Sequence, residues 1–250
     1  MPFIQDWNNE QIEVAYSKGR VMAVADFSNN LIRHGIPLWP PGAIVQKLYN
    51  SRHSYAYKEQ AFKIVTRRLE YYCDLQSVHS EDAITWSFFG PLRYLSVEDQ
   101  AAALNWILSY FGLDGRNTKC EISLWRRIPH PQTLVPGGPE IDFLLTGDKD
   151  VVAGEAKWRS PFGIGQGVNR DMNQIQLRQR FLRIYGHTLF GNRRFHVLAL
   201  GRSPCIQLVE PVQGVDFRSM CWTTLTQYES HPRAEEFQRY LTWKNEHSLA

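Results

Sequence analysis

The chain has 250 residues, of which 43% are hydrophobic and 21% are charged, and its formal net charge is +3. This composition is typical of a folded globular protein and excludes a disordered chain. The length suits one large domain, or one domain with an accessory region. Because the net charge is small, any basic surface has to be local.

The sequence argues against a membrane protein and against a zinc-binding protein. No stretch approaches eighteen consecutive apolar residues, so a membrane-spanning helix is not expected. The first twelve residues are polar and acidic rather than leader-like, and we expect a cytoplasmic protein. The four cysteines are widely spaced and form neither a Cys-x-x-Cys pair nor a Cys/His cluster, which argues against a zinc site.

Residues 1–72 are predicted to form a helical N-terminal region. Over residues 10–32, apolar side chains recur at helical spacing, and the Gly- and Pro-rich residues 35–42 then end the helix. A second helix is predicted over residues 55–72. We expect this region to bind a protein partner, a second copy of the chain as a homodimer, or DNA.

Residues 73–250 are predicted to form the second domain, in which helices and strands alternate. Its first helix opens at Ser80 as the N-cap, with Glu81 and Asp82 in the first turn, where negative charge is favoured. The elements expected after it are a helix over residues 97–110, a strand over 120–128, two strands within 139–157, a helix over 171–185, and strands over 195–200 and 220–225.

The two strands within residues 139–157 are joined by a tight turn at residues 146–150 and carry the most informative side chains. Successive side chains of a strand alternate faces, so Glu155 and Lys157 point the same way, and Asp142 lies within reach across the hairpin. Two carboxylates suit a hard cation such as Mg²⁺. The alternative is an ordinary surface hairpin whose Glu and Lys form a weak ion pair.

This pattern resembles the PD-(D/E)xK superfamily of metal-dependent nucleases, over roughly residues 78–225. Asp142 matches the central aspartate, and Glu155 and Lys157 match the acidic-x-Lys pair. The proline stands at Pro139 rather than directly before the aspartate. The resemblance implies an α/β fold with a restriction-endonuclease-like αβββαβ core and a mixed central sheet.

The resemblance also implies an activity, the Mg²⁺-dependent hydrolysis of phosphodiester bonds in DNA, with Mn²⁺ as a substitute ion. Asp142 and Glu155 would hold the metal and Lys157 would orient the attacking water. Glu81 would add a supporting carboxylate, and its neighbour Asp82 is the alternative for that role. A function in restriction or antiviral defence follows by analogy. Two other functions stay open: a non-cutting nucleic-acid-binding or assembly module on the same fold, and an RNA-directed nuclease.

A basic segment follows the motif. Residues 158–202 hold eight arginines and a single acid, Asp171. A local positive face beside a metal site would favour a polyanionic substrate. In the helix expected there, Gln174 and Gln176 are followed by arginines four residues later, so the Gln-x-x-x-Tyr pattern of exonuclease-like branches is not matched. Each of these glutamines either contacts a nucleic-acid backbone or lies on a solvated helix face.

Overall fold

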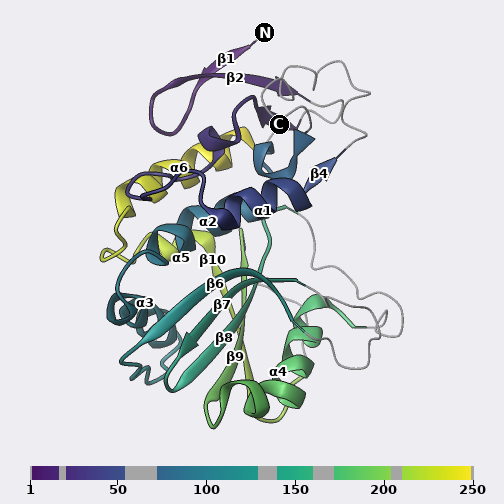
Figure 1. The fold of residues 1–250 in the computed structure, drawn as a ribbon, viewed down its shortest axis with the longest axis vertical. Coiled ribbons are helices and arrows are strands. Elements are labelled where there is room, and N and C mark those ends of the chain that lie inside the picture. Colours follow the sequence, from purple (N-terminus) through teal and green to yellow (C-terminus); the bar gives the residue numbers. More distant parts are fainter. Residues whose placement is uncertain are drawn as a thin grey trace. The chain divides into compact units, whose positions relative to one another are not determined.

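The computed structural model describes residues 2–16, 21–53, 72–128, 140–159, 172–203 and 210–248 (Figure 1). The chain forms two compact units. The first unit combines Met1–Pro91 with Pro232–Ala250, and the second is the continuous stretch Leu92–His231. This division differs from the boundary at residues 72 and 73 that the sequence suggested, because both ends of the chain contribute to the first unit.

A five-stranded mixed sheet forms the centre of the second unit, with the strands in the order β10-β9-β8-β7-β6. The strands are β6 (Cys120–Arg127), β7 (Glu140–Gly147), β8 (Asp150–Ala156), β9 (Arg194–Gly201) and β10 (Val215–Cys221). β6, β7 and β8 pair antiparallel, whereas β8, β9 and β10 pair in parallel. The expected mixed α/β fold is therefore confirmed at this level. The strand expected over residues 220–225 was wrong in part, because Trp222–Leu225 forms the short helix α5.

Two long helices flank this sheet (Figure 1). α3 (Val97–Tyr110) begins where Ser96 accepts a hydrogen bond from the Asp99 N–H, and it packs against β6 and β7. α4 (Gln174–Phe190) begins at Asn173, whose side chain forms a capping box with Gln176, and it packs against β8, β9 and β10. Such caps satisfy N–H groups that the first helical turn leaves unpaired.

An apolar core between α4 and the sheet sets the direction of the motif side chains. Its fully buried members include Val151, Ala153, Ile175 and Phe181. Val151, Ala153 and Glu155 follow one another at two-residue spacing on β8, so all three point to the face that α4 covers. The strand places Glu155 at the edge of this core, next to α4.

The first unit is built from short strands and helices. Its three-stranded sheet has the order β1-β2-β3, and β4 pairs with β5. The elements are β1 (Phe3–Gln5), β2 (Gln11–Tyr16), β3 (Met22–Val24), the 3-10 helices η1 (Phe27–Asn30) and η4 (Asp74–Gln76), α1 (Gly42–Asn50), β4 (Arg52–His53), β5 (Tyr72–Cys73), α2 (Glu81–Leu92) and α6 (Ala234–His247).

The helical N-terminal region expected from the sequence was wrong over residues 10–32. Ile12 and Val14 alternate with more exposed residues along β2, which is a strand pattern, and both are β-branched. The carboxylate of Asp6 accepts the Glu10 N–H over 2.9 Å and closes the turn that returns the chain into β2. The helix predicted over residues 55–72 lies outside the described residues, except for its last residue, which belongs to β5.

The C-terminal helix α6 completes the core of the first unit. The Tyr240 hydroxyl donates to the Asn30 carbonyl over 3.1 Å, and the Lys244 ammonium donates to the Val78 carbonyl. Tyr240 and Lys244 are both fully buried. Among the described residues, no helix combines the length and the apolar composition needed to cross a bilayer.

Candidate functional site

The β7–β8 hairpin brings Asp142 and Glu155 together. Phe143 pairs with Gly154 in the antiparallel register, so Asp142 and Glu155 occupy the next opposed position. Oδ2 of Asp142 accepts the Ala156 N–H over 2.7 Å, which fixes the aspartate against the end of β8. Oδ1 of Asp142 has no hydrogen-bond partner among the described residues. One carboxylate oxygen is therefore held and the other is open.

Glu155 is the most enclosed member of the site. Only 1% of its side chain is exposed, and each of its oxygens faces a cation. The Lys157 ammonium lies 3.0 Å from Oε1, and the Arg178 guanidinium donates to Oε2 over 2.8 Å. Glu155 of β8 and Lys157, which directly follows β8, thus meet on one face, and α4 supplies a third charged group.

Two opposing effects act on the pKa of Glu155. Burial and the negative charge of Asp142 raise this pKa to about 7, although the positive charges of Arg178 and Lys157 act in the other direction. A buried carboxylate beside a second carboxylate favours the approach of positive charge. The site already supplies two such charges from its own side chains.

Arg178 is the residue that the sequence did not identify. Only 2% of its side chain is exposed, and Nη2 also donates to the Glu140 carbonyl at the start of β7. Its Nε and Nη1 have no hydrogen-bond partner within the described part of the chain. Arg178 stands three residues after Ile175 and three before Phe181, both of which are buried, so its position on the apolar stripe of α4 was the available signal.

The backbone of Lys157 is fixed from two sides. Its N–H donates to the Leu200 carbonyl over 2.7 Å, and its carbonyl accepts the Trp222 indole N–H over 2.9 Å. Trp158, the residue after the motif, is 3% exposed and therefore packs inside the protein, and the Arg202 guanidinium lies 5.4 Å from its ring centroid. These contacts hold the motif end of β8 beside β9 and α5.

The expected supporting acid, Glu81, belongs to the first unit, whereas the hairpin carboxylates belong to the second. Glu81 lies in the first turn of α2, which Ser80 caps by accepting the Ala83 N–H. There its negative charge acts on the buried Lys244. The alternative acid, Asp82, forms an ion pair with Lys47 over 3.0 Å. The supporting role of Glu81 stays a prediction.

Other candidate side chains have local partners or stay unassigned. Gln176 serves the cap of α4, where its side chain accepts the Asn173 N–H over 2.9 Å. The buried Gln179 amide has no hydrogen-bond partner in the described ranges. The loop over residues 161–167 and Asp171 lie outside the described residues.

The carboxylates of the hairpin have the donor chemistry of a Mg²⁺ site. Two adjacent carboxylates supply the hard oxygen ligands that this ion prefers, and one oxygen of Asp142 is open. Within residues that the structure describes, no group of three or more His, Cys, Asp or Glu side chains gathers. The pair fits Mg²⁺ as a site with two protein carboxylates, where water and substrate oxygens complete the shell, as is usual for this ion.

Comparisons of the chain with protein-family models, with curated proteins and with solved structures gave no match. No relative therefore supports a chemistry for the site, and that chemistry is inferred from the geometry of the site alone.

Proposed function

We propose that the chain is a metal-dependent nuclease of the PD-(D/E)xK type. The observation that carries this proposal is the meeting of Asp142, Glu155 and Lys157 on one face of the β7–β8 hairpin, with 3.0 Å between the Lys157 ammonium and Oε1 of Glu155. The order of helix, three antiparallel strands, helix and parallel strand supports a restriction-endonuclease-like core.

Each site residue has a role in phosphodiester hydrolysis under this proposal. Asp142 and Glu155 hold the divalent ion, and Lys157 places its positive charge beside the attacked phosphate and orients the attacking water. Arg178 neutralises and positions Glu155. A bound Mg²⁺ supplies Lewis-acid polarisation of the phosphate and a bound water of lowered pKa.

One rearrangement follows from the contacts of Glu155. Each Glu155 oxygen already contacts one cation, and although each keeps a second lone pair, the positive charges of Lys157 and Arg178 repel a metal ion, so movement of one cation would favour metal binding at Glu155. Lys157 lies at the end of β8 and is 12% exposed, whereas Arg178 is 2% exposed. The lysine is the partner with more freedom to turn toward a substrate.

The proposed substrate is DNA. The arginines that follow the motif supply a cationic surface in the described ranges, since Arg159, Arg183, Arg194 and Arg202 are exposed. Such a surface attracts a phosphate backbone without reading its sequence. Glu81 is retained in the proposal as a supporting acid, and a place in defence against foreign DNA is proposed by analogy alone.

The test is cleavage of supercoiled plasmid with Mg²⁺ or Mn²⁺, comparing the wild-type protein with Asp142→Ala and Lys157→Ala. The matched control is Glu121→Gln, which alters an exposed acid of the same sheet. We expect metal-dependent nicking that both site substitutions abolish and the control retains. Cutting that survives both site substitutions would contradict the proposal. A labelled RNA strand tested alongside separates the RNA-directed alternative.

A non-cutting nucleic-acid-binding module is the second candidate function. It is favoured by the charge balance of the site, in which the two carboxylates Asp142 and Glu155 face the two cations Lys157 and Arg178. A site neutralised by its own side chains has less need of a metal ion. This candidate gains support if the protein binds DNA but neither cuts it nor binds Mn²⁺ in a manner that depends on Asp142.

A further inference from the structure

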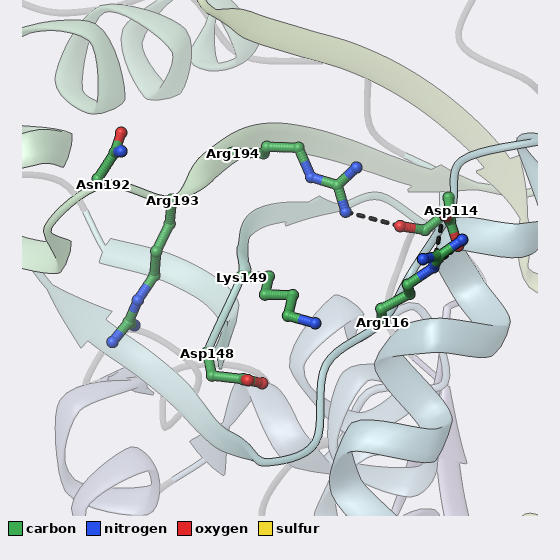
Figure 2. Close-up of a pocket in the computed structure, with 7 residues that line it drawn as sticks. All are labelled: Asp114, Arg116, Asp148, Lys149, Asn192, Arg193 and Arg194. Atoms are coloured by element: carbon green, nitrogen blue, oxygen red, sulfur yellow. Dashed lines mark hydrogen bonds and ion pairs between the residues drawn. The ribbon is translucent and has the colours of Figure 1, made fainter.

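A pocket of about 420 Å³ opens at the other end of the β7–β8 hairpin, away from Asp142 and Glu155. Three segments of the second unit line it: the connection from α3 to β6, the hairpin turn, and the connection from α4 to β9. Its charged side chains are Arg116, Lys149, Arg193, Arg194, Asp114 and Asp148 (Figure 2). The four cations exceed the two carboxylates, so the lining has an excess of positive charge.

The carboxylates of the pocket already have partners inside the protein. Asp114 forms an ion pair with Arg116 over 2.8 Å. Asp148 accepts hydrogen bonds from the Thr118 N–H over 2.8 Å and from the Thr118 hydroxyl over 3.2 Å. Both acids therefore serve the loops that build the pocket, and these contacts offset part of their repulsion toward an incoming anion.

The cations of the pocket divide into two classes. Arg116 and Arg194 are committed: Arg116 pairs with Asp114, and the Arg194 guanidinium lies 2.8 Å from the buried carboxylate of Asp150 and donates to the Asp114 carbonyl over 2.7 Å. Lys149 and Arg193 have no ion-pair or hydrogen-bond partner for their side chains among the described residues. These two cations are available to a ligand.

The parallel pairing of β8 and β9 brings Lys149 and Arg193 close together. β8 begins at Asp150 and β9 begins at Arg194, and these two residues are partners in the register. Lys149 and Arg193 therefore precede neighbouring strands, whose backbones lie roughly 4.8 Å apart. Figure 2 shows that their side chains diverge, with Lys149 extending toward Arg116 and Arg193 extending away from it. Two diverging cations suit two anionic groups better than one.

We propose that this pocket binds the phosphate backbone of a nucleic acid, with Lys149 and Arg193 contacting separate phosphates. The inference rests on the proposed function and adds a second contact to the same substrate. Asp142 lies five residues before the end of β7 at Gly147, which is roughly 17 Å along a strand. A nucleic acid that runs parallel to the hairpin would, at roughly 3.4 Å per nucleotide of one strand, be contacted in the pocket about five nucleotides from the cleaved bond.

The test measures the binding of a labelled DNA duplex at several salt concentrations by fluorescence anisotropy. EDTA is present, so that neither metal binding nor cleavage contributes. The pocket variant is Lys149→Gln with Arg193→Gln. The matched control is Arg93→Gln with Arg218→Gln, which removes two positive charges from the same unit outside the pocket and outside the arginines of the proposed DNA-binding surface. Circular dichroism and thermal melting establish that both variants are folded.

We expect the pocket variant to bind roughly 10- to 100-fold more weakly at about 100 mM salt, with a salt slope that is shallower by about 2. The control variant should change much less. Equal losses in the two variants, or no loss in the pocket variant, would overturn the inference. Cleavage is assayed separately with Asp142→Ala, so a failed pocket and a failed nuclease give different results.

Discussion

Arg178 donates a hydrogen bond from Nη2 to Oε2 of Glu155 over 2.8 Å, and 2% and 1% of the two side chains are exposed. This pair joins the first turns of α4 to the end of β8. The same Nη2 reaches the Glu140 carbonyl, so one guanidinium nitrogen ties the helix to both strands of the hairpin. The conformation of the candidate site therefore depends on a residue outside the hairpin.

Replacement of Arg178 by Met should destabilise the protein. It leaves a buried Glu155 with one cation fewer, and the loss of one partner from a buried ion pair costs about 3–5 kcal/mol. The double variant Arg178→Met with Glu155→Gln removes both buried charges and should recover much of this loss. Denaturation by urea measures the free energy of unfolding of each variant. A double variant that is no more stable than Arg178→Met would show that the destabilisation does not come from breaking the charge pair.

Replacement of Gly154 by Ala should also be destabilising. A Cβ at this position would lie 2.0 Å from Cζ of Phe143, its cross-strand partner, and the Phe143 side chain is fully buried. Overpacking of this kind costs about 1–3 kcal/mol. Adding Phe143→Leu should restore part of the stability in a thermal melt. The control is Gly42→Ala, because no atom lies within 4 Å of the added Cβ. Gly191→Ala is unsuited as a control because the φ of Gly191 is +73°.

Binding of Mn²⁺ should depend on the hairpin carboxylates. Asp142→Asn keeps the shape of the side chain but removes its charge, and we expect Mn²⁺ affinity to fall by at least tenfold, about 1.4 kcal/mol. Glu121→Gln, which alters an exposed acid, should bind as the wild-type protein does. Electron paramagnetic resonance counts free Mn²⁺ directly and needs no enzymatic activity. Identical affinities for all three proteins would place any metal elsewhere.

The buried Lys244 should make the stability of the first unit depend on pH. Burial lowers the pKa of its ammonium group to about 7, while the charge of Glu81 acts in the opposite direction. In the unfolded chain this pKa is about 10.4. Above pH 7 the unfolded state therefore binds more protons than the folded state, and the stability contributed by this group rises with pH.

The prediction for Lys244 is tested on the difference between wild type and Lys244→Met. Between pH 7 and pH 9 the free energy of unfolding of the wild-type protein should rise relative to that of the variant. Below pH 6 the difference between the two should not change with pH. Urea denaturation at each pH gives both curves. A difference that stays constant across this range would show that the lysine is charged in the folded state as well.

The sheet of the second unit could be predicted from the sequence because its strands carry short apolar runs bounded by turn residues. The β7–β8 hairpin was found for this reason, and Asp148 and Lys149 form its turn. Arg178 was not found, because an arginine among glutamines on a helix has the composition of a solvated face. Only the packing of α4 on β8 buries it.

The first unit was predicted less well, for two physical reasons. Ile12 and Val14 alternate as in a strand, but apolar side chains over the longer stretch of residues 10–32 also recur at helical spacing, and the turn that Asp6 closes decides between the two. The second reason is distance along the chain. Tyr240 and Asn30 meet across 210 positions, and local periodicity carries no information about such a contact.

Because the first unit contains both ends of the chain, its parts are synthesised at different times. The segment Leu92–His231 is continuous, so its sheet and flanking helices are complete before α6 has been translated. The strands at the start of the chain, by contrast, leave the ribosome first and yet wait longest for their packing partner. During that interval the surface that α6 later covers is open to chaperones and proteases, and a premature stop after residue 231 would leave a complete second unit and an incomplete first unit.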